Sequence, residues 1–198
     1  MNEPAPVLEL DLNLMKPAVP GTRKRLAASR FTSAVVIEIR VEAPLWNARR
    51  NARAVLRRAV RRAAATACVS QGEVSVVLCD DEAMRVLNRD WRQKDMSTNV
   101  LAFPVDAGNA APGQPRLLGD IVIAYQTLQR EAHMQAKPFA QHLAHLAVHG
   151  FLHLVGYDHR TAQEAQVMER LETSILARLD IPNPYGTGQI RRSPIRHA

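Results

Sequence analysis

Residues 139–159 read FAQHLAHLAVHGFLHLVGYDH and contain the most informative pattern of the chain. Its first part lacks proline and is rich in leucine and alanine, which favours a helix. Apolar side chains cover most of the circumference of that helix, which is typical of a helix buried inside a domain. Four histidines spaced three, four and four residues apart fall on one narrow stripe of it: His142, His145, His149 and His153. We therefore expect a buried helix whose histidine stripe faces an internal site.

The end of this stretch has the spacing of a metal site. Imidazoles one helical turn apart, at His149 and His153, can aim their nitrogen atoms at one point. Gly156 allows the helix to end in a left-handed conformation because it has no Cβ, and the chain can then return with His159. Three neutral imidazoles suit Zn²⁺ and leave one coordination position open, whereas a structural zinc site is closed by a fourth ligand. The spacing therefore predicts one catalytic Zn²⁺ per chain.

Four further polar residues are candidates for supporting the site without binding the metal. His142 and His145 either pack in the core or hydrogen-bond around the ligands. Two roles stay open for Asp158, which either orients a ligand imidazole or caps the turn. Asp120 likewise either faces the cleft or has a plain turn role.

Gly150 stands where zinc proteases of the H-E-x-x-H-x-x-G-x-x-H type carry a glutamate. That glutamate takes the proton from the zinc-bound water, so its loss disfavours a protease. A glycine inside a helix costs roughly 1 kcal/mol relative to alanine. Gly150 therefore indicates close helix packing, room for a bulky substrate beside the metal, or both.

Outward from this stretch, the hydrophobic pattern predicts alternating strands and helices. Strands are expected at 33–41, 74–79, 100–103 and 117–123. Helices are expected at 45–69, 81–91 with Asp80 and Asp81 at its start, 124–134, 139–155 and 161–179. Strands early and helices late predict an α+β domain. It would contain a small mixed four-stranded sheet and about five helices, with the zinc site on a buried helix and the following turn.

Length and composition fit a single globular domain with extra segments. The chain has 198 residues, of which 46% are hydrophobic and 23% charged, so a largely disordered chain is excluded. We expect the domain at 33–185, after a basic disordered leader, 1–32, and before a basic disordered tail, 186–198. A patternless insertion is expected at 107–115. The absence of an apolar run of about 18 residues excludes a transmembrane helix. The scarcity of cysteine and the lack of a secretory signal predict a cytoplasmic protein.

The net charge of +7 favours a polyanionic partner such as nucleic acid. Arginines run down one face of the helix predicted at 45–69, and no acidic residue separates them: Arg50, Arg53, Arg57 and Arg61. Such a face is either ordinary solvated surface or a contact for the phosphates of an RNA backbone. RNA binding by these four side chains is our hypothesis.

Five motifs together resemble the YbeY family, the bacterial rRNA maturation endoribonucleases. They are HGFLHLVGYDH at 149–159, LNRDWR at 87–92, STNVLAFP at 97–104, LGDI at 118–121 and NPY at 183–185. Ala102 replaces the serine that is usual in the third motif. The resemblance covers about 33–185, which is most of the chain.

The resemblance implies a zinc-dependent, single-strand-specific endoribonuclease that matures the 3′ end of small-subunit (16S) ribosomal RNA and acts in ribosome quality control. It implies ribosomal RNA and the small ribosomal subunit as partners, and no membrane. It makes His149, His153 and His159 the metal ligands. Arg92, on the loop after the helix predicted at 81–91, matches an arginine proposed to be catalytic. Two alternatives remain: a non-catalytic, zinc-stabilised, ribosome-associated RNA-binding protein, and a zinc hydrolase that acts on another substrate.

Overall fold

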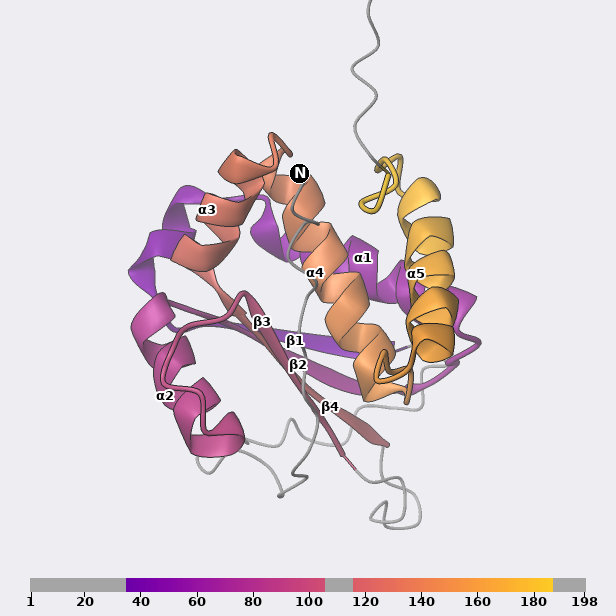
Figure 1. Cartoon of the computed structure of the whole chain (residues 1–198), viewed down its shortest axis with the longest axis horizontal. Helices are drawn as coiled ribbons and strands as arrows, with labels where there is room; N and C mark the ends of the chain where they lie inside the picture. The colour runs from indigo at the N-terminus through magenta and orange to yellow at the C-terminus, as the bar shows by residue number, and fades with distance from the viewer. Residues whose placement is uncertain (1–34, 106–115, 187–198) are drawn as a thin grey trace, which may run out of the picture.

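The structure is a computed structural model that describes residues 35–105 and 116–186. Within these ranges, helices α1, α4 and α5 pack on one face of a four-stranded sheet, and α2 lies on the other face (Figure 1). The predicted leader at 1–32, the insertion at 107–115 and all but the first residue of the tail at 186–198 lie outside the described residues. These boundaries therefore stay predictions.

The sheet is mixed, as predicted. Its strands are β1 (Val35–Val41), β2 (Gly72–Cys79), β3 (Val100–Pro104) and β4 (Leu117–Ala124), in the spatial order β1-β2-β4-β3. β1, β2 and β4 are parallel, whereas β3 runs antiparallel to β4 and forms an edge. The two central strands are buried on both faces, which is why β2 and β4 read as nearly continuous apolar runs.

Five α-helices are described, which confirms the predicted fold class. They are α1 (Ala52–Thr66), α2 (Asp81–Arg92), α3 (Tyr125–Met134), α4 (Phe139–Leu154) and α5 (Ala162–Ala177). α2 begins as expected, because the side chain of Asp80 accepts a hydrogen bond from the backbone N–H of Ala83 at 2.9 Å. No helix in the described ranges is both long enough and apolar enough to cross a membrane.

The helix predicted at 45–69 is wrong at its start. Pro44–Ala48 forms a short 3₁₀ helix, and α1 begins only at Ala52. The cause is Trp46, which is buried and donates its indole N–H to the carbonyl of Cys79 at 2.9 Å. Anchoring Trp46 in the core turns the chain before α1, so Arg50 precedes the helix.

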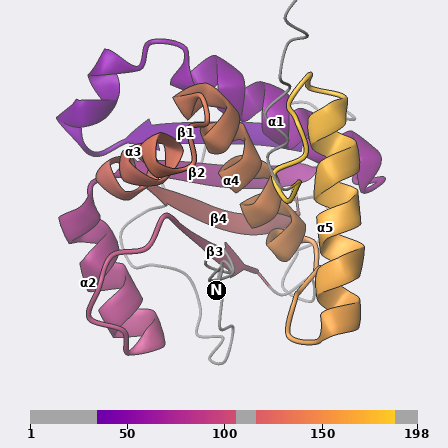
Figure 2. The ribbon, with the colours of Figure 1, turned by 45° about the horizontal axis from the view of Figure 1, so that its top comes forward.

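α4 is the central helix of the domain. It crosses the strands with α5 beside it, and its residues are buried from His142 to Leu154 (Figures 1 and 2). Gly150 lies against β4, where an added Cβ would be 2.9 Å from Cγ2 of Ile121. Of the two explanations for this glycine, the contact supports close packing of the helix on the sheet.

The two faces of β4 belong to different cores. Ile121 and Ile123 pack in the large core, which includes α4 and α1. Val122 and Ala124 pack in a smaller core with Met84 of α2. Successive side chains of a strand point to opposite faces of the sheet, so the position of a residue along β4 determines which core its side chain enters.

Candidate metal centre

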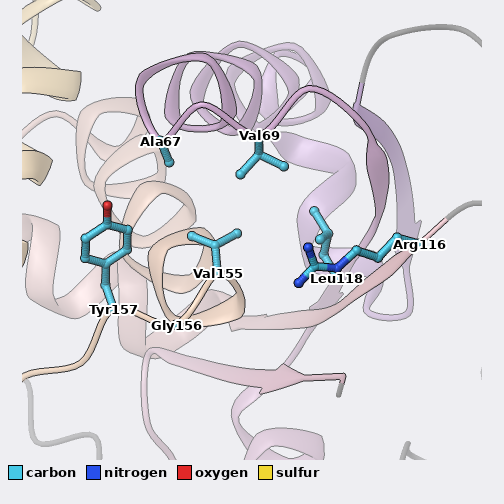
Figure 3. Close-up of a pocket in the computed structure, with 7 residues that line it drawn as sticks. All are labelled: Ala67, Val69, Arg116, Leu118, Val155, Gly156 and Tyr157. Carbon is cyan, nitrogen blue, oxygen red and sulfur yellow. The ribbon is translucent and has the colours of Figure 1, made fainter. Parts of the chain in front are cut away.

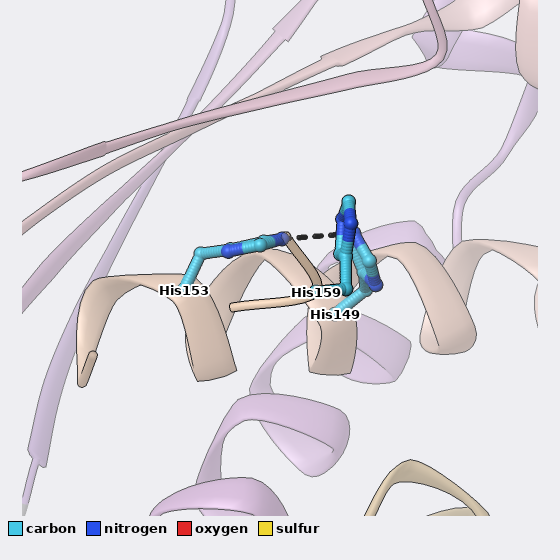
Figure 4. A group of neighbouring side chains, drawn as sticks. All are labelled: His149, His153 and His159. Atoms are coloured by element: carbon cyan, nitrogen blue, oxygen red, sulfur yellow. Dashed lines mark hydrogen bonds between the residues drawn. The ribbon is translucent and has the colours of Figure 1, made fainter. Parts of the chain in front are cut away.

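Three histidines converge at the end of α4, as their spacing predicted. His149 and His153 are buried on the helix, and the half-buried His159 lies on the loop that follows. One possible ligand atom from each residue lies within 4.8 Å of those from the others. Nε2 of His149 is 3.1 Å from Nε2 of His153, and the ring of His159 lies beside them (Figure 4). The three rings therefore surround one point. We call these residues the histidine triad.

The return of the chain to the triad depends on the turn after α4. Gly156 adopts a φ of +94°, in the region that favours glycine. The N–H groups of Gly156 and Tyr157 then bind the carbonyls of His153 and Leu152, at 3.1 and 3.0 Å. These bonds close the helix end and direct His159 back toward the helix.

Asp158 holds the backbone of this loop. Its carboxylate accepts the backbone N–H of His159 at 2.8 Å and pairs with Arg160 at 2.7 Å. Of the two roles left open for Asp158, these contacts support the turn role. The carboxylate positions His159 through its main chain.

Burial favours the neutral form of two histidines of the triad, His153 and His159. Burial, reinforced by neighbouring histidines, lowers the pKa of His153 to about 3 and also lowers the pKa of His159. Neutral imidazoles carry the lone pair that a metal needs. Nε2 of His159 is buried and makes no hydrogen bond within the described parts of the chain. A buried nitrogen without a partner, aligned with two others, fits a metal ion.

A buried carboxylate that the sequence analysis missed lies behind the triad. Glu172 of α5 has no exposed surface. One of its oxygens is 2.6 Å from Nδ1 of His149, and the other is 2.9 Å from Nε2 of His145. The hydroxyl of Tyr185 donates a hydrogen bond to the same carboxylate. The available signal was a glutamate within the apolar stripe of α5, which contains Met168, Glu172, Ile175 and Leu176.

The surroundings of Glu172 lower the pKa of its carboxyl group. Burial by itself would raise its pKa, but the hydrogen bonds from His145 and His149 outweigh burial and leave the pKa below its usual range. Burial lowers the pKa of His145, so this ring is neutral. The carboxylate therefore acts as an acceptor for the surrounding N–H and O–H groups.

The other two histidines of the stripe contact carboxylates. Nε2 of His142 lies 2.8 Å from Glu131, whose carboxylate also accepts two hydrogen bonds from the amide of Asn99. His145 contacts Glu172, as described above. Both residues are buried and both contact a carboxylate, but only the partner of His145 also contacts a predicted ligand, His149.

Arg92 is the last residue of α2, and its predicted place on a loop is wrong. The helix extends to it because the left-handed conformation is adopted only by the next residue, Gln93, at a φ of 58°. Trp91 packs edge-on against Phe103 of β3, with ring centroids 5.6 Å apart. The end of α2 thus lies at the edge strand β3, against which α4 packs from the other face of the sheet.

Asp120 lies on the opposite face of the sheet from the triad. It shares that face of β4 with Val122, and both line a cavity of 270 Å³ beside α2 together with Cys79 and Leu87. Of the two roles left open for Asp120, this position supports neither, because the residue lies within strand β4 rather than in a turn and on the face away from the triad. Its position in the strand, two residues from Val122, turns it toward α2 instead.

The predicted arginine face is exposed but not uniform. Arg50 precedes α1 and is exposed, and Arg61 is exposed on the helix, whereas Arg57 is half-buried. Arg53 donates a hydrogen bond from Nη1 to the carbonyl of Ile39 at 2.7 Å, so part of its guanidinium is engaged within the domain.

A second cavity, of 240 Å³, adjoins the turn that leads to His159 (Figure 3). Arg116, which immediately precedes β4, extends toward it, and Tyr157 lines its other side. None of the three histidines of the triad lines this cavity, so it is distinct from the metal site.

Comparisons with known proteins find close relatives. Residues 39–180 match the family model described as Endoribonuclease YbeY. A protein of Rhodopseudomonas palustris named Endoribonuclease YbeY is 47% identical, over 98% of this chain and 100% of its own length. A protein of Nitrobacter winogradskyi with the same name is 52% identical, over 76% of this chain and 82% of its own length. A solution structure from Thermotoga maritima covers 80% of this chain and 100% of its own at 21% identity, with a TM-score of 0.46.

Proposed function

The chain belongs to the YbeY family of endoribonucleases, and from that premise we propose that it is a zinc-dependent endoribonuclease that cleaves single-stranded RNA. Its substrate is the small-subunit (16S) ribosomal RNA near the 3′ end. It acts in the cytoplasm, in rRNA maturation and ribosome quality control, with the small ribosomal subunit as its partner. The observation that carries the proposal is the histidine triad.

The triad suits Zn²⁺ by its donor set. His149, His153 and His159 would hold the ion, and the cluster includes no other donor from the described residues. Three protein ligands leave a position open, which is typical of catalytic rather than structural zinc. When bound, the metal supplies Lewis acidity for cleavage of the phosphodiester. His149 and His153 contribute buried rings, and His159 contributes a half-buried one.

Arg92 is proposed as the catalytic side chain. A guanidinium can make two parallel hydrogen bonds to the oxygens on which charge develops during phosphodiester cleavage. The loop after Arg92 is held by Arg85, which binds both oxygens of Asp95 at 2.8 and 2.9 Å. Asn88 also donates to the carbonyl of Met96 at 2.7 Å. These bonds keep the end of α2 in a fixed position at the edge of the sheet.

RNA binding is assigned to the arginine face. Arg50, Arg57 and Arg61 contact phosphates, and Arg53 contributes the part of its guanidinium that Ile39 does not occupy. Exposed guanidinium groups in a row attract a polyanion whatever its base sequence. This agrees with a substrate that is recognised as single-stranded RNA and positioned by its backbone.

The proposal is tested with metal-free protein to which zinc is returned. We expect the zinc-loaded protein to cleave a labelled single-stranded RNA, to leave the same RNA intact in a duplex, and to be inactive after chelation. His153→Ala should lose both zinc and cleavage, because one of three ligands is removed. His142→Gln is the control: it removes a histidine from the same helix but outside the triad, and should keep both.

Two results would contradict the proposal. Full zinc content in His153→Ala after dialysis against a mild chelator would refute the ligand set. A folded, zinc-loaded protein that leaves single-stranded RNA intact would favour the non-catalytic RNA-binding alternative. Cleavage of a peptide or amide without cleavage of RNA would favour a different zinc hydrolase.

A further inference from the structure

We propose that Glu172 is a positioning residue for the metal centre, which fixes the ring of His149 so that its Nε2 faces the other two histidines. The inference rests on the proposed zinc site and adds a residue from a different helix to it. Glu172 does not touch the substrate or the metal in this proposal. It acts through His149.

The contacts of Glu172 leave its carboxylate one orientation. The side chain is fully buried, and Oε1 lies 2.6 Å from Nδ1 of His149. Oε2 lies 2.9 Å from Nε2 of His145 and accepts the hydroxyl of Tyr185. Because the partners of its two oxygens lie on α4 and on the C-terminal segment, the carboxylate cannot rotate without breaking several hydrogen bonds.

This orientation selects the tautomer of His149. An ionised carboxylate only accepts hydrogen bonds, so the nitrogen that faces it must carry the hydrogen. Nδ1 of His149 is then the N–H group, and Nε2 carries the lone pair. Nε2 is the atom that lies 3.1 Å from Nε2 of His153, inside the triad. Glu172 thus favours the tautomer in which His149 can bind a metal, and it raises the basicity of that nitrogen.

Tyr185 connects the C-terminal segment to this arrangement. Its hydroxyl binds Glu172, and its backbone N–H donates to the side chain of Asn183 at 3.0 Å. Lys137, in the loop before α4, donates a hydrogen bond to the carbonyl of Pro184 at 3.2 Å and holds the same segment. The segment therefore supports Glu172 from behind, and loss of the Tyr185 hydroxyl should have a smaller effect than loss of the carboxylate.

A matched control can distinguish the proposed positioning role of Glu172 from a purely structural one. The domain contains another carboxylate–histidine pair, between Glu131 of α3 and His142 of α4, with a separation of 2.8 Å. His142 is outside the triad. Glu131→Gln therefore removes the same charge from the same kind of pair without touching a predicted ligand.

The experiment measures the Zn²⁺ dissociation constant by competition with a chromophoric chelator. We expect Glu172→Gln to raise it about 10- to 100-fold, as is typical of losing a carboxylate behind a ligand histidine. Tyr185→Phe should raise it less, and Glu131→Gln should leave it at the wild-type value. The absorption spectrum of the Co²⁺-substituted protein should change in Glu172→Gln but not in Glu131→Gln. Thermal unfolding of the metal-free proteins reports the structural cost of each change separately.

The outcomes distinguish this inference from the proposed function. A wild-type dissociation constant in Glu172→Gln would overturn the positioning role alone. Equal weakening in Glu172→Gln and Glu131→Gln would show a general structural effect and overturn it too. A wild-type protein that binds no Zn²⁺ would overturn both proposals. If Glu172→Gln does not fold, Tyr185→Phe decides, because it removes only one donor to Oε2 and an unchanged dissociation constant there would overturn the inference.

Discussion

The histidines on α4 differ in what their ring nitrogens contact, although they share one stripe. His142 contacts Glu131, and His145 contacts Glu172, so each has a carboxylate partner. His149 has two different neighbours, with Glu172 at Nδ1 and His153 at Nε2. The positions of the carboxylates therefore distinguish the proposed ligand His149 from His142 and His145, whose ring contacts are to carboxylates.

Substitution of Arg92 tests the proposed mechanism at the level of a single residue, because it should affect the rate of cleavage but not the binding of RNA. In the proposed mechanism many arginines share the contacts with bound RNA, whereas the guanidinium of Arg92 alone stabilises the charge of the transition state. We expect Arg92→Ala to lower kcat roughly a hundredfold or more, as for the loss of one oxyanion donor, with RNA affinity and zinc content unchanged. Arg92→Lys should restore only part of the rate, since an ammonium cannot make the planar two-bond contact. Single-turnover cleavage, RNA binding and zinc content are measured on each protein.

Arg89 provides the matched control for Arg92. It lies in the same last turn of α2, is about half exposed and pairs with Asp90 at 3.0 Å. Arg89→Ala removes the same charge from the same helix end and should keep the wild-type rate. Equal single-turnover rates for wild type and Arg92→Ala would remove Arg92 from the mechanism.

At the scale of elements, the metal site depends on how closely α4 approaches β4. Gly150 costs the helix about 1 kcal/mol in propensity relative to alanine. The fold accepts this cost because a Cβ at Gly150 would lie 2.9 Å from Cγ2 of Ile121, closer than packed carbon atoms approach. The glycine therefore sets the depth at which the histidine stripe sits over the sheet.

A double-mutant cycle tests this packing. We expect Gly150→Ala to destabilise the metal-free protein, because overpacking costs about 1–3 kcal/mol and exceeds the gain in helix propensity. In an Ile121→Ala background the obstacle is gone, so Gly150→Ala should instead stabilise by up to about 1 kcal/mol. The free energy of unfolding in urea is measured for the four proteins. The same sign and size in both backgrounds would mean that Ile121 does not explain the glycine.

At the scale of the whole molecule, the charge of +7 is concentrated partly on α1. Arg57 and Arg61 belong to the proposed RNA face, whereas Arg58 and Arg62 lie about 100° further around the helix. Arg58 also pairs with Asp180 at 3.4 Å. The helix therefore contains two pairs of arginines with the same charge, whose side chains point in different directions around the helix axis.

RNA binding should respond differently to the loss of these two pairs. Replacing Arg57 and Arg61 with glutamine should reduce the slope of log K against log salt by about 0.7 for each lost phosphate contact on a single strand. Replacing Arg58 and Arg62 should reduce it less, because this pair points away from the proposed face. Binding is titrated at several salt concentrations. Equal slopes for the two double variants would show that general charge, and not this face, attracts the RNA.

Local sequence is enough to predict the elements and the histidine triad. The strands, the N-cap of α2 and the five α-helices follow from periodicity and turn residues, which act between neighbours in the chain. The triad could be predicted because two of its members are one helical turn apart and Gly156 returns the third within a few residues. Such a site is local, so spacing alone constrains its geometry.

Contacts between residues that are distant in the sequence depend on the tertiary structure. Glu172 is 23 residues from His149 along the chain, and its partner depends on how α5 packs on α4. The face of Asp120 depends on the register and on the helices that cover each side of β4, and the start of α1 depends on the burial of Trp46. These contacts are set by packing between separate segments, whose relative placement no local pattern encodes.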